Sequence, residues 1–451
     1  MRAAVSYMSS LYYVWTVGGV TTLLNIAGLD VLNFYFLCLT MCFALLFCED
    51  TLPFMASLIY TPFTVSARRA PYTIASSEYY SDPVVLGQLI FLCVLLAAVF
   101  FIRFFTRREW KKVFRKRLLT YGFFAVGAAL ALNGLFSGIY AVISPLWGIM
   151  LWICMVGLYY YLSATLIWEK METLQYAANV FFMLGVDIAL QMAALYLANP
   201  SFIDGSLKDY IRLGWGVSNT IGNILLMTLP FGLYLTHTSK RPAAYFLLST
   251  GILVATVFTY SRAALIFAVP VFIASLIFSC VSGRNRLTVV TVTSVIAAAF
   301  IIYAVSRTDS LKKIFDFYIQ NGLDDRGRLE LWLEGLREYL KAPVFGYGFA
   351  YRFGDPLSAI YFLHNTLLQY LCACGVVGLV CYLYHRAETV WLFLKRMTAA
   401  RLYMGMSVAG VLGYGLLGGS MTNPVILLFM GAIYALAEKD YLETHTVRAL
   451  Y

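Results

Sequence analysis

The chain has 451 residues, of which 61% are hydrophobic and only 12% are charged. Soluble domains average about 25% charged residues, so this composition excludes an ordinary soluble protein and predicts a polytopic membrane protein. The formal net charge of +10 does not indicate nucleic acid, because much of it lies in one stretch, RFFTRREWKKVFRKR (103–117), between two apolar runs. By the positive-inside rule we expect this stretch to be a cytoplasmic loop.

Apolar runs follow one another along the whole chain. Because a helix needs about 20 residues to cross the hydrocarbon, we expect an all-α bundle of about 12–14 transmembrane helices with both termini cytoplasmic. The first run shows no clear cleavage site, so we expect an uncleaved anchor. The runs lie at 11–28, 31–47, 52–66, 84–102, 118–137, 141–162, 174–198, 218–236, 243–259, 263–280, 288–305, 365–384, 402–418 and 424–438. Those at 52–66 and 424–438 are short for a span.

Three polar stretches are expected to face outward: 66–83, 199–216 and the long loop 306–364. Loops of this length in compact proteins are usually functional. The expected domains are N-terminal helices (1–200), a core with the long loop (201–385), and C-terminal helices with a cytoplasmic tail (386–451).

Part of the long loop has helical periodicity, in DDRGRLELWLEGLREYLKAP. Its leucines share one face, with Asp325 as a cap and Pro343 as a stop. These leucines are Leu329, Leu333, Leu336 and Leu340. The helix either lies along the outer membrane surface or packs on the bundle as a lid. The GYG at 346–348 is expected to be a turn after Pro343, too short for a phosphate loop.

Arg262, in VFTYSRAALIF, stands at the outer junction of two apolar runs. An arginine at membrane depth costs several kcal/mol unless it is paired or faces water, so it is a functional candidate. The alternative is an arginine that snorkels from a short turn. Asp187, in GVDIALQ, is flanked by apolar residues and is either a partner of Arg262 or part of a proton path.

Two further arginines lie on the loop helix. Arg328 and Trp332 are four residues apart and share a face, while Arg326 points to another side. A guanidinium matches two phosphate oxygens at once. One arginine from the bundle and one from the loop would therefore suit a pyrophosphate, although surface arginines usually contact water or a carboxylate.

His364 and Asn365, in FLHNTLLQYL, precede the run that begins at 365. Asn365 suits the N-cap position, where its side-chain oxygen accepts a backbone N–H. His364 either merely precedes this cap or is a titratable group that waits for a substrate.

The order of several motifs resembles the C-terminal half of the bacterial O-antigen ligase and polymerase family of membrane glycosyltransferases. These motifs are TYSRAAL, GRLELWLEGLREYLKAPVFGYGF, HNTLLQYLCACGVVGLVCYLY and the earlier WGVSNTIGNILLMTLPFGLYL, which contains Asn223. The resemblance covers about residues 215–385, whereas the first 200 residues match only in hydropathy.

The resemblance implies an inverting glycosyltransferase of the bacterial plasma membrane that needs no metal or other cofactor. Its donor would be a glycan on undecaprenyl pyrophosphate, presented on the outer face, and its acceptor a glycan or lipid. Arg262 and Arg328 would bind the pyrophosphate, and His364 would be the general base. Asn365, Trp332, Arg326 and Asn223 would support the site. Polymerisation is expected in preference to ligation, because a ligase needs an acceptor that only some bacteria make.

The rival from another class is a transporter or flippase of lipid-linked sugars. Against it stand the lack of repeat halves and of broken helices at matched positions. The nine cysteines show neither a disulfide framework nor zinc spacing.

Overall fold

The structure is a computed structural model, and it describes residues 1–64, 82–138, 140–200, 205, 208–214, 216–282, 285–306, 312, 316–318, 327–352, 355–356 and 362–448. The chain divides into two compact units. Unit 1 combines Met1–Trp110 with Thr165–Leu323, and unit 2 combines Lys111–Ala164 with Asp324–Tyr451.

Unit 1 is a helical bundle with one small antiparallel strand pair. Its helices are α1 (Arg2–Met8), α2 (Leu11–Ile26), α3 (Asp30–Phe47), α4 (Leu52–Tyr60), α5 (Pro83–Thr106), α9 (Lys170–Ala198), α10 (Ser218–Thr238), α11 (Pro242–Phe258), α12 (Arg262–Ser282) and α13 (Arg286–Ser306). Short 3₁₀ turns lie at Thr61–Phe63 and Lys208–Tyr210, and strands β1 (Arg212–Leu213) and β2 (Gly216–Val217) precede α10.

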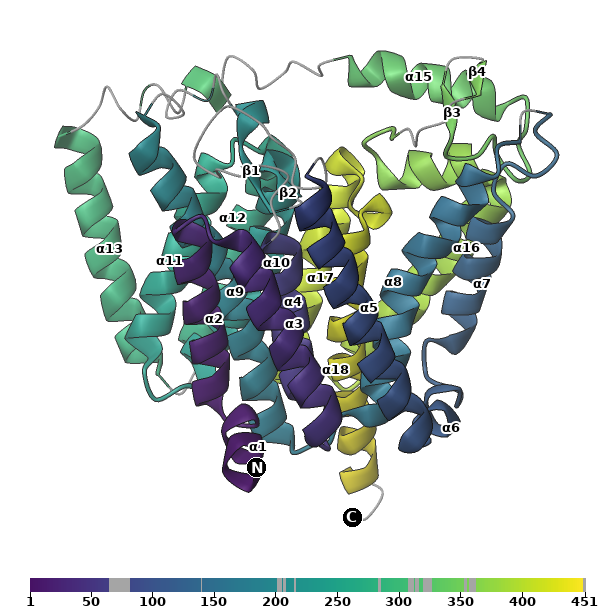
Figure 1. Cartoon of the computed structure of the whole chain (residues 1–451). Coiled ribbons are helices and arrows are strands. Elements are labelled where there is room, and N and C mark those ends of the chain that lie inside the picture. The colour runs from purple at the N-terminus through teal and green to yellow at the C-terminus, as the bar shows by residue number, and fades with distance from the viewer. Residues whose placement is uncertain are drawn as a thin grey trace. The chain divides into compact units, whose positions relative to one another are not determined.

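Helix α10 forms the core of unit 1. It packs against α9, α11 and α12 (Figure 1), and its residues from Ile221 to Thr236 are buried. An apolar helix that is buried on all sides has no need of an amphipathic pattern, which explains why LLMTLPFGLYL has no polar face.

Unit 2 contains α7 (Thr120–Ala131), α8 (Ile143–Thr165), α15 (Arg328–Tyr339), α16 (Thr366–Leu394), α17 (Ala399–Gly418) and α18 (Pro424–Arg448). The short helix α6 (Trp110–Val113) lies at its start, strands β3 (Tyr351–Arg352) and β4 (Asp355–Pro356) pair in its long loop, and a 3₁₀ turn spans Ser420–Thr422. Helix α15 lies across the end of α16 and α7 (Figure 1).

Helix α16 is broken at Gly375, which has φ 70° and ψ −171°. The loop after Pro343 occupies the break. The N–H groups of Tyr347 and Gly348 donate to the carbonyls of Cys372 and Ala373 at 2.9 and 3.0 Å.

The second half of α16 is capped by the same loop. The N–H groups of Val376 and Val377 donate to the carbonyls of Pro343 and Val344 at 2.9 and 3.3 Å. Every backbone group freed by a break at membrane depth needs such a partner. The turn lies at 343–345, three residues before the position expected for it, and the GYG stretch that follows supplies N–H donors to the carbonyls of the broken helix. The sequence did not predict this break, and one break is not the pair of broken helices at matched positions that a transporter would show.

Two buried arginines cap the ends of helices. Arg103, from α5, donates to the carbonyls of Cys48 and Glu49 beyond α3 at 2.7 and 2.8 Å, and its charge is paired with Glu109 at 2.7 Å. Arg401 donates to the carbonyl of Lys395 after α16 at 2.6 Å and pairs with Asp440 at 2.7 Å. Cations favour helix C-termini, where carbonyls lack intrahelical partners.

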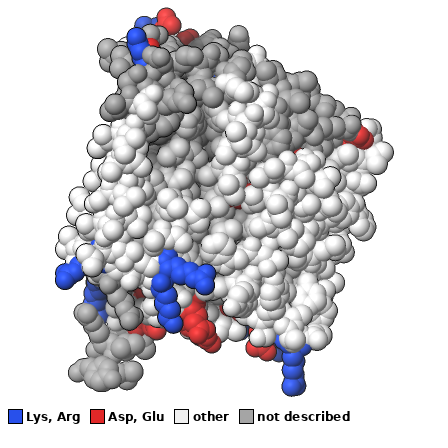
Figure 2. Space-filling view, turned by 90° about the vertical axis from the view of Figure 1, so that its left-hand side faces the viewer, with Lys and Arg blue, Asp and Glu red and all other residues white. Residues whose placement is uncertain are grey.

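The all-α polytopic prediction is confirmed. Each apolar run predicted from the sequence coincides with a helix, although the run at 52–66 yields only the nine-residue α4 and the run at 365–384 extends to Leu394. Among the described residues, six helices are long and apolar enough to cross a membrane, namely α3, α5, α8, α9, α12 and α16. Figure 2 shows charged side chains gathered near the two ends of one face, with a broad uncharged band between them.

Candidate functional site

His364 stands immediately before the first half of α16. Asn365 is the N-cap of this helix, and its side-chain oxygen accepts the N–H of Leu368 at 3.0 Å, as predicted. His364 itself has φ +53°, in the left-handed region that non-glycine residues rarely adopt. Such strain persists only when neighbouring contacts hold it, and it is common at functional sites.

The neighbour Leu363 provides these contacts. Its N–H donates to the side-chain oxygen of Gln369 at 2.7 Å, and its carbonyl accepts the indole N–H of Trp332 at 2.7 Å. With the Asn365 cap on the other side, the backbone of His364 is fixed at both ends. His364 is partly accessible to solvent while Leu363 is buried.

Arg328 approaches the same place from the start of α15. Its guanidinium donates to the carbonyl of Leu417 near the end of α17 at 2.7 Å, and the side chain of Asn365 donates to the adjacent carbonyl of Leu416 at 2.9 Å. The α17 terminus thus brings Arg328 and His364 to one place. Two of the three residues proposed for the chemistry lie together.

The charge of Arg328 acts on the imidazole. Partial burial and, second, the Arg328 guanidinium lower the pKa of His364 from its ordinary value of 6.5. Both causes disfavour the imidazolium. At neutral pH the ring is therefore neutral and able to accept a proton.

Helix α15 packs through a face other than the predicted leucine stripe. Leu331, Trp332, Leu336 and Tyr339 contact the buried cluster of Tyr347, Leu363 and Cys372. Of the predicted stripe only Leu336 belongs to this face, and Leu329, Leu333 and Leu340 are exposed. The reason is that Trp332 and Tyr339 bury more area than a leucine and Trp332 also gains a hydrogen bond. The cap predicted at Asp325 is also wrong, because Gly327 is the N-cap of α15 and Asp325 lies outside the described residues.

Arg262 and Asn223 belong to unit 1. Arg262 is the first residue of α12, is half-buried, and follows Tyr260, which has φ +53°. Asn223 is buried in α10, next to Gly222, where a Cβ would lie 2.8 Å from Ala264 in the first turn of α12. Its side-chain oxygen has no hydrogen-bond partner in the described part of the chain. The convergence of Arg262 with Arg328 and His364 stays a prediction, and Arg326 lies outside the described residues.

Asp187 is fully buried in α9 and accepts a hydrogen bond from Gln191, one turn further along the same helix, at 3.0 Å. Its other oxygen has no hydrogen-bond partner among the described residues. Thr22 and Asn25 of α2 lie close to the carboxyl group. Asp187 thus belongs to a buried polar cluster of α2 and α9, and neither a pairing with Arg262 nor a proton path follows from these contacts.

Sequence reasoning missed two supports of the site. Gln369 orients Leu363, and the end of α17 receives both Arg328 and Asn365. Gln369 carried a signal, since a buried glutamine one turn into an apolar helix needs a partner. The carbonyls at the end of α17 could not be predicted from the sequence, because every residue has the same backbone acceptor.

The helices and the uncharged band define a multi-pass membrane protein. Residues 244–383 match the model of the O-antigen ligase family, which supports the assignment of the chain to the O-antigen ligase and polymerase family. The match supports, for this part of the chain, a membrane enzyme that ligates or polymerises surface polysaccharide. A comparison with curated proteins finds no match.

Proposed function

We propose that the protein is a glycosyltransferase that takes a glycan from undecaprenyl pyrophosphate on the outer face of the bacterial plasma membrane. Polymerisation of a surface polysaccharide is the proposed reaction, with transfer to a lipid acceptor as the alternative. The family match over residues 244–383 supports the reaction class. The observation that carries the site is the meeting of Arg328 and His364 at the end of α17.

The proposed step is a displacement at the anomeric carbon. The acceptor hydroxyl gives its proton to His364, its oxygen bonds to the anomeric carbon, and the bond from that carbon to the pyrophosphate oxygen breaks. One displacement inverts the configuration. The electron pair leaves with the pyrophosphate, so negative charge develops there and Arg262 and Arg328 stabilise it. No metal is needed when two guanidiniums supply this charge.

The left-handed backbone at His364 supports the role of a base. A general base must be held within hydrogen-bond reach of the proton that it accepts. Contacts at Leu363 and Asn365 fix the backbone on both sides of the ring.

Purified protein incubated with an undecaprenyl-pyrophosphate oligosaccharide tests the proposal. We expect released undecaprenyl pyrophosphate and a lengthened glycan, with activity that survives EDTA. Release of undecaprenyl pyrophosphate without glycan transfer, or complete loss on chelation that Mg²⁺ restores, would contradict the proposed reaction or its charge assignment.

Variants of the site residues sharpen the test. His364→Ala should slow transfer about 10²–10⁴-fold while donor binding stays nearly intact. Arg328→Lys should impair turnover, because an ammonium keeps the charge and loses the two-pronged contact. Arg337→Lys is the matched control, since Arg337 is exposed in the last turn of the same helix. If Arg328→Lys and Arg337→Lys were equally active, Arg328 would not take part in binding the pyrophosphate.

A further inference from the structure

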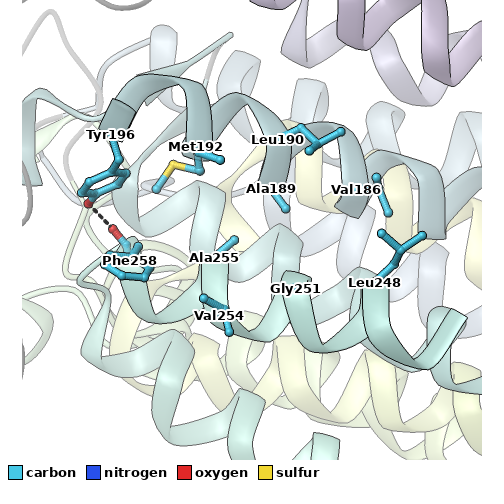
Figure 3. A pocket seen from close by; sticks show the side chains of 11 residues that line it. Val186, Ala189, Leu190, Met192, Tyr196, Leu248, Gly251, Val254, Ala255 and Phe258 are labelled. Atoms are coloured by element: carbon cyan, nitrogen blue, oxygen red, sulfur yellow. Dashed lines mark hydrogen bonds between the residues drawn. The ribbon is translucent and has the colours of Figure 1, made fainter. Parts of the chain in front are cut away.

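Unit 1 has an apolar groove between α9 and α11 (Figure 3). Its volume is about 360 Å³, which falls in the range of ligand sites, roughly 300–1,000 Å³. The groove opens outward, since Leu190 and Val254 on its rim are 47% and 49% exposed. Its floor includes Gly251, where a Cβ would meet nothing within 4 Å.

The groove runs along the helices. It extends from Val186 and Leu248 at one end to Tyr196 and Phe258 at the other (Figure 3). Ten residues of helix rise about 15 Å, which is half of the hydrocarbon thickness of about 30 Å. Because Phe258 ends α11 and Ala198 ends α9, the groove occupies the half of these helices that we assign to the outer leaflet.

Aromatic residues mark the end of the groove at Phe258. The hydroxyl of Tyr196 donates to the carbonyl of Phe258, and the hydroxyl of Tyr318 donates to the carbonyl of Val257 at 2.7 Å. The ring of Tyr260 lies 6.0 Å from that of Tyr318. Tyrosines gather at the level where lipid headgroups meet hydrocarbon.

Arg262 follows this end directly. It begins α12 four residues after Phe258, and four residues of extended chain span at most about 14 Å. A lipid whose chain lies in the groove would therefore carry its headgroup near a guanidinium. An anionic headgroup fits this charge, and the groove holds a chain that descends through one leaflet.

We propose that the groove between α9 and α11 binds the hydrocarbon chain of the polyprenyl pyrophosphate donor and directs its pyrophosphate to Arg262. This inference rests on the proposed function. A 15 Å segment of a single hydrocarbon chain fits the volume of about 360 Å³, whereas a helix 15 Å long and about 10 Å across occupies roughly 1,200 Å³. Binding the chain adds affinity for long-chain donors and contributes nothing to the displacement itself.

Groove-filling variants test the inference. Gly251→Phe and Ala193→Phe fill the groove from opposite helices, and both positions are exposed, so folding should be retained. Gly87→Phe in α5 is the matched control, because Gly87 is equally open and lies outside the groove. We expect the KM for an undecaprenyl donor to rise roughly tenfold in the groove variants, through lost CH₂ contacts, with kcat unchanged. The KM for a donor with two isoprene units should not change, nor should either KM in the control.

A photoreactive undecaprenyl pyrophosphate without glycan gives a readout that does not depend on turnover. We expect cross-links to α9 and α11 in the wild type and in Gly87→Phe, and their loss in Gly251→Phe. Cross-links elsewhere, or an unchanged KM in both groove variants of an active enzyme, would overturn the groove assignment. Specific cross-links in the groove without transfer from either donor would instead overturn the proposed reaction and leave the lipid site standing.

Discussion

The left-handed backbone at His364 is a local cost that three neighbouring contacts maintain. A non-glycine residue in this region costs about 1–3 kcal/mol. Two hydrogen bonds to Leu363 and the Asn365 cap hold it there. The arrangement places His364 beside Arg328, and partial burial and, second, the charge of the arginine lower the pKa of its imidazole.

This pairing predicts a pH profile. His364 must be neutral to accept a proton, and its pKa is lowered by partial burial and by Arg328. The acid limb of kcat/KM, which reports the free enzyme, should therefore lie below pH 6.5. The Arg328→Gln variant lacks the positive charge that repels the imidazolium, so the pKa of His364 should rise. The acid limb of kcat/KM, measured on the residual activity of this variant, should therefore move to higher pH. A limb that does not move would show that another group titrates.

Asp187 gives a second prediction at this scale. Its carboxyl is buried in α9, and within the described residues its hydrogen bond comes from Gln191. Ionised groups at membrane depth are costly, and the amide of Asp187→Asn still offers an oxygen to Gln191. We expect this variant to retain thermal stability and transfer activity.

Asp187→Leu should lower stability by about 1–3 kcal/mol, because it leaves Gln191 buried without its acceptor. Thermal unfolding in detergent compares the two variants. If Asp187→Asn folded normally and lost transfer, the carboxyl would take part in the chemistry and a proton path would regain support.

At the scale of elements, the break in α16 depends on glycine. Gly375 has φ +70°, and a Cβ there would lie 2.1 Å from the carbonyl oxygen of Val344. Gly375→Ala should therefore destabilise unit 2 by about 1–3 kcal/mol or more. Gly157→Ala in α8 is the control, since its nearest neighbour would be 3.9 Å away and alanine is the better helix former.

Thermal inactivation in detergent measures this difference. We expect Gly375→Ala to inactivate at lower temperature than the wild type, and Gly157→Ala at the same temperature or higher. Equal stability of both variants would mean that the inserted loop does not require a glycine at the break.

The elements also show what the sequence could predict. Hydrophobic runs are local properties, so every predicted run coincides with a helix, although α4 and α7 are shorter than their runs and α16 and α18 are longer. The break at Gly375 was not predictable, because it exists only when the loop around Tyr347 and Gly348 inserts there. The prediction of the buried face of α15 was wrong for a related reason. The periodicity indicated Leu329 and Leu333, whereas Trp332 and Tyr339 pack against the rest of unit 2. His364, Asn365 and Arg328 could be selected as candidates because each carries a chemical signal of its own, and the structure brings them together.

At the scale of the whole molecule, orientation across the membrane is the central prediction. The basic stretch 103–117 should be cytoplasmic and the loop 306–364 external. We expect a membrane-impermeant maleimide on intact cells to label Lys341→Cys and not Lys112→Cys. The background should carry Cys93→Ser, since Cys93 is exposed. Labelling at 112 and not at 341 would reverse the orientation and with it the proposed side of the reaction.

The division of unit 2 between two distant segments has a consequence for biogenesis. The N–H of Gly122 in α7 donates to the carboxylate of Glu388 in α16 at 2.9 Å, across 266 residues of chain. At about 5–20 residues per second, α7 leaves the ribosome on the order of tens of seconds before this partner exists. The second segment of unit 1 is synthesised within that interval. The nascent chain must therefore keep α7 and α8, which contact each other, inserted without their later partner α16. Insertion chaperones and membrane proteases compete for this pair during that period.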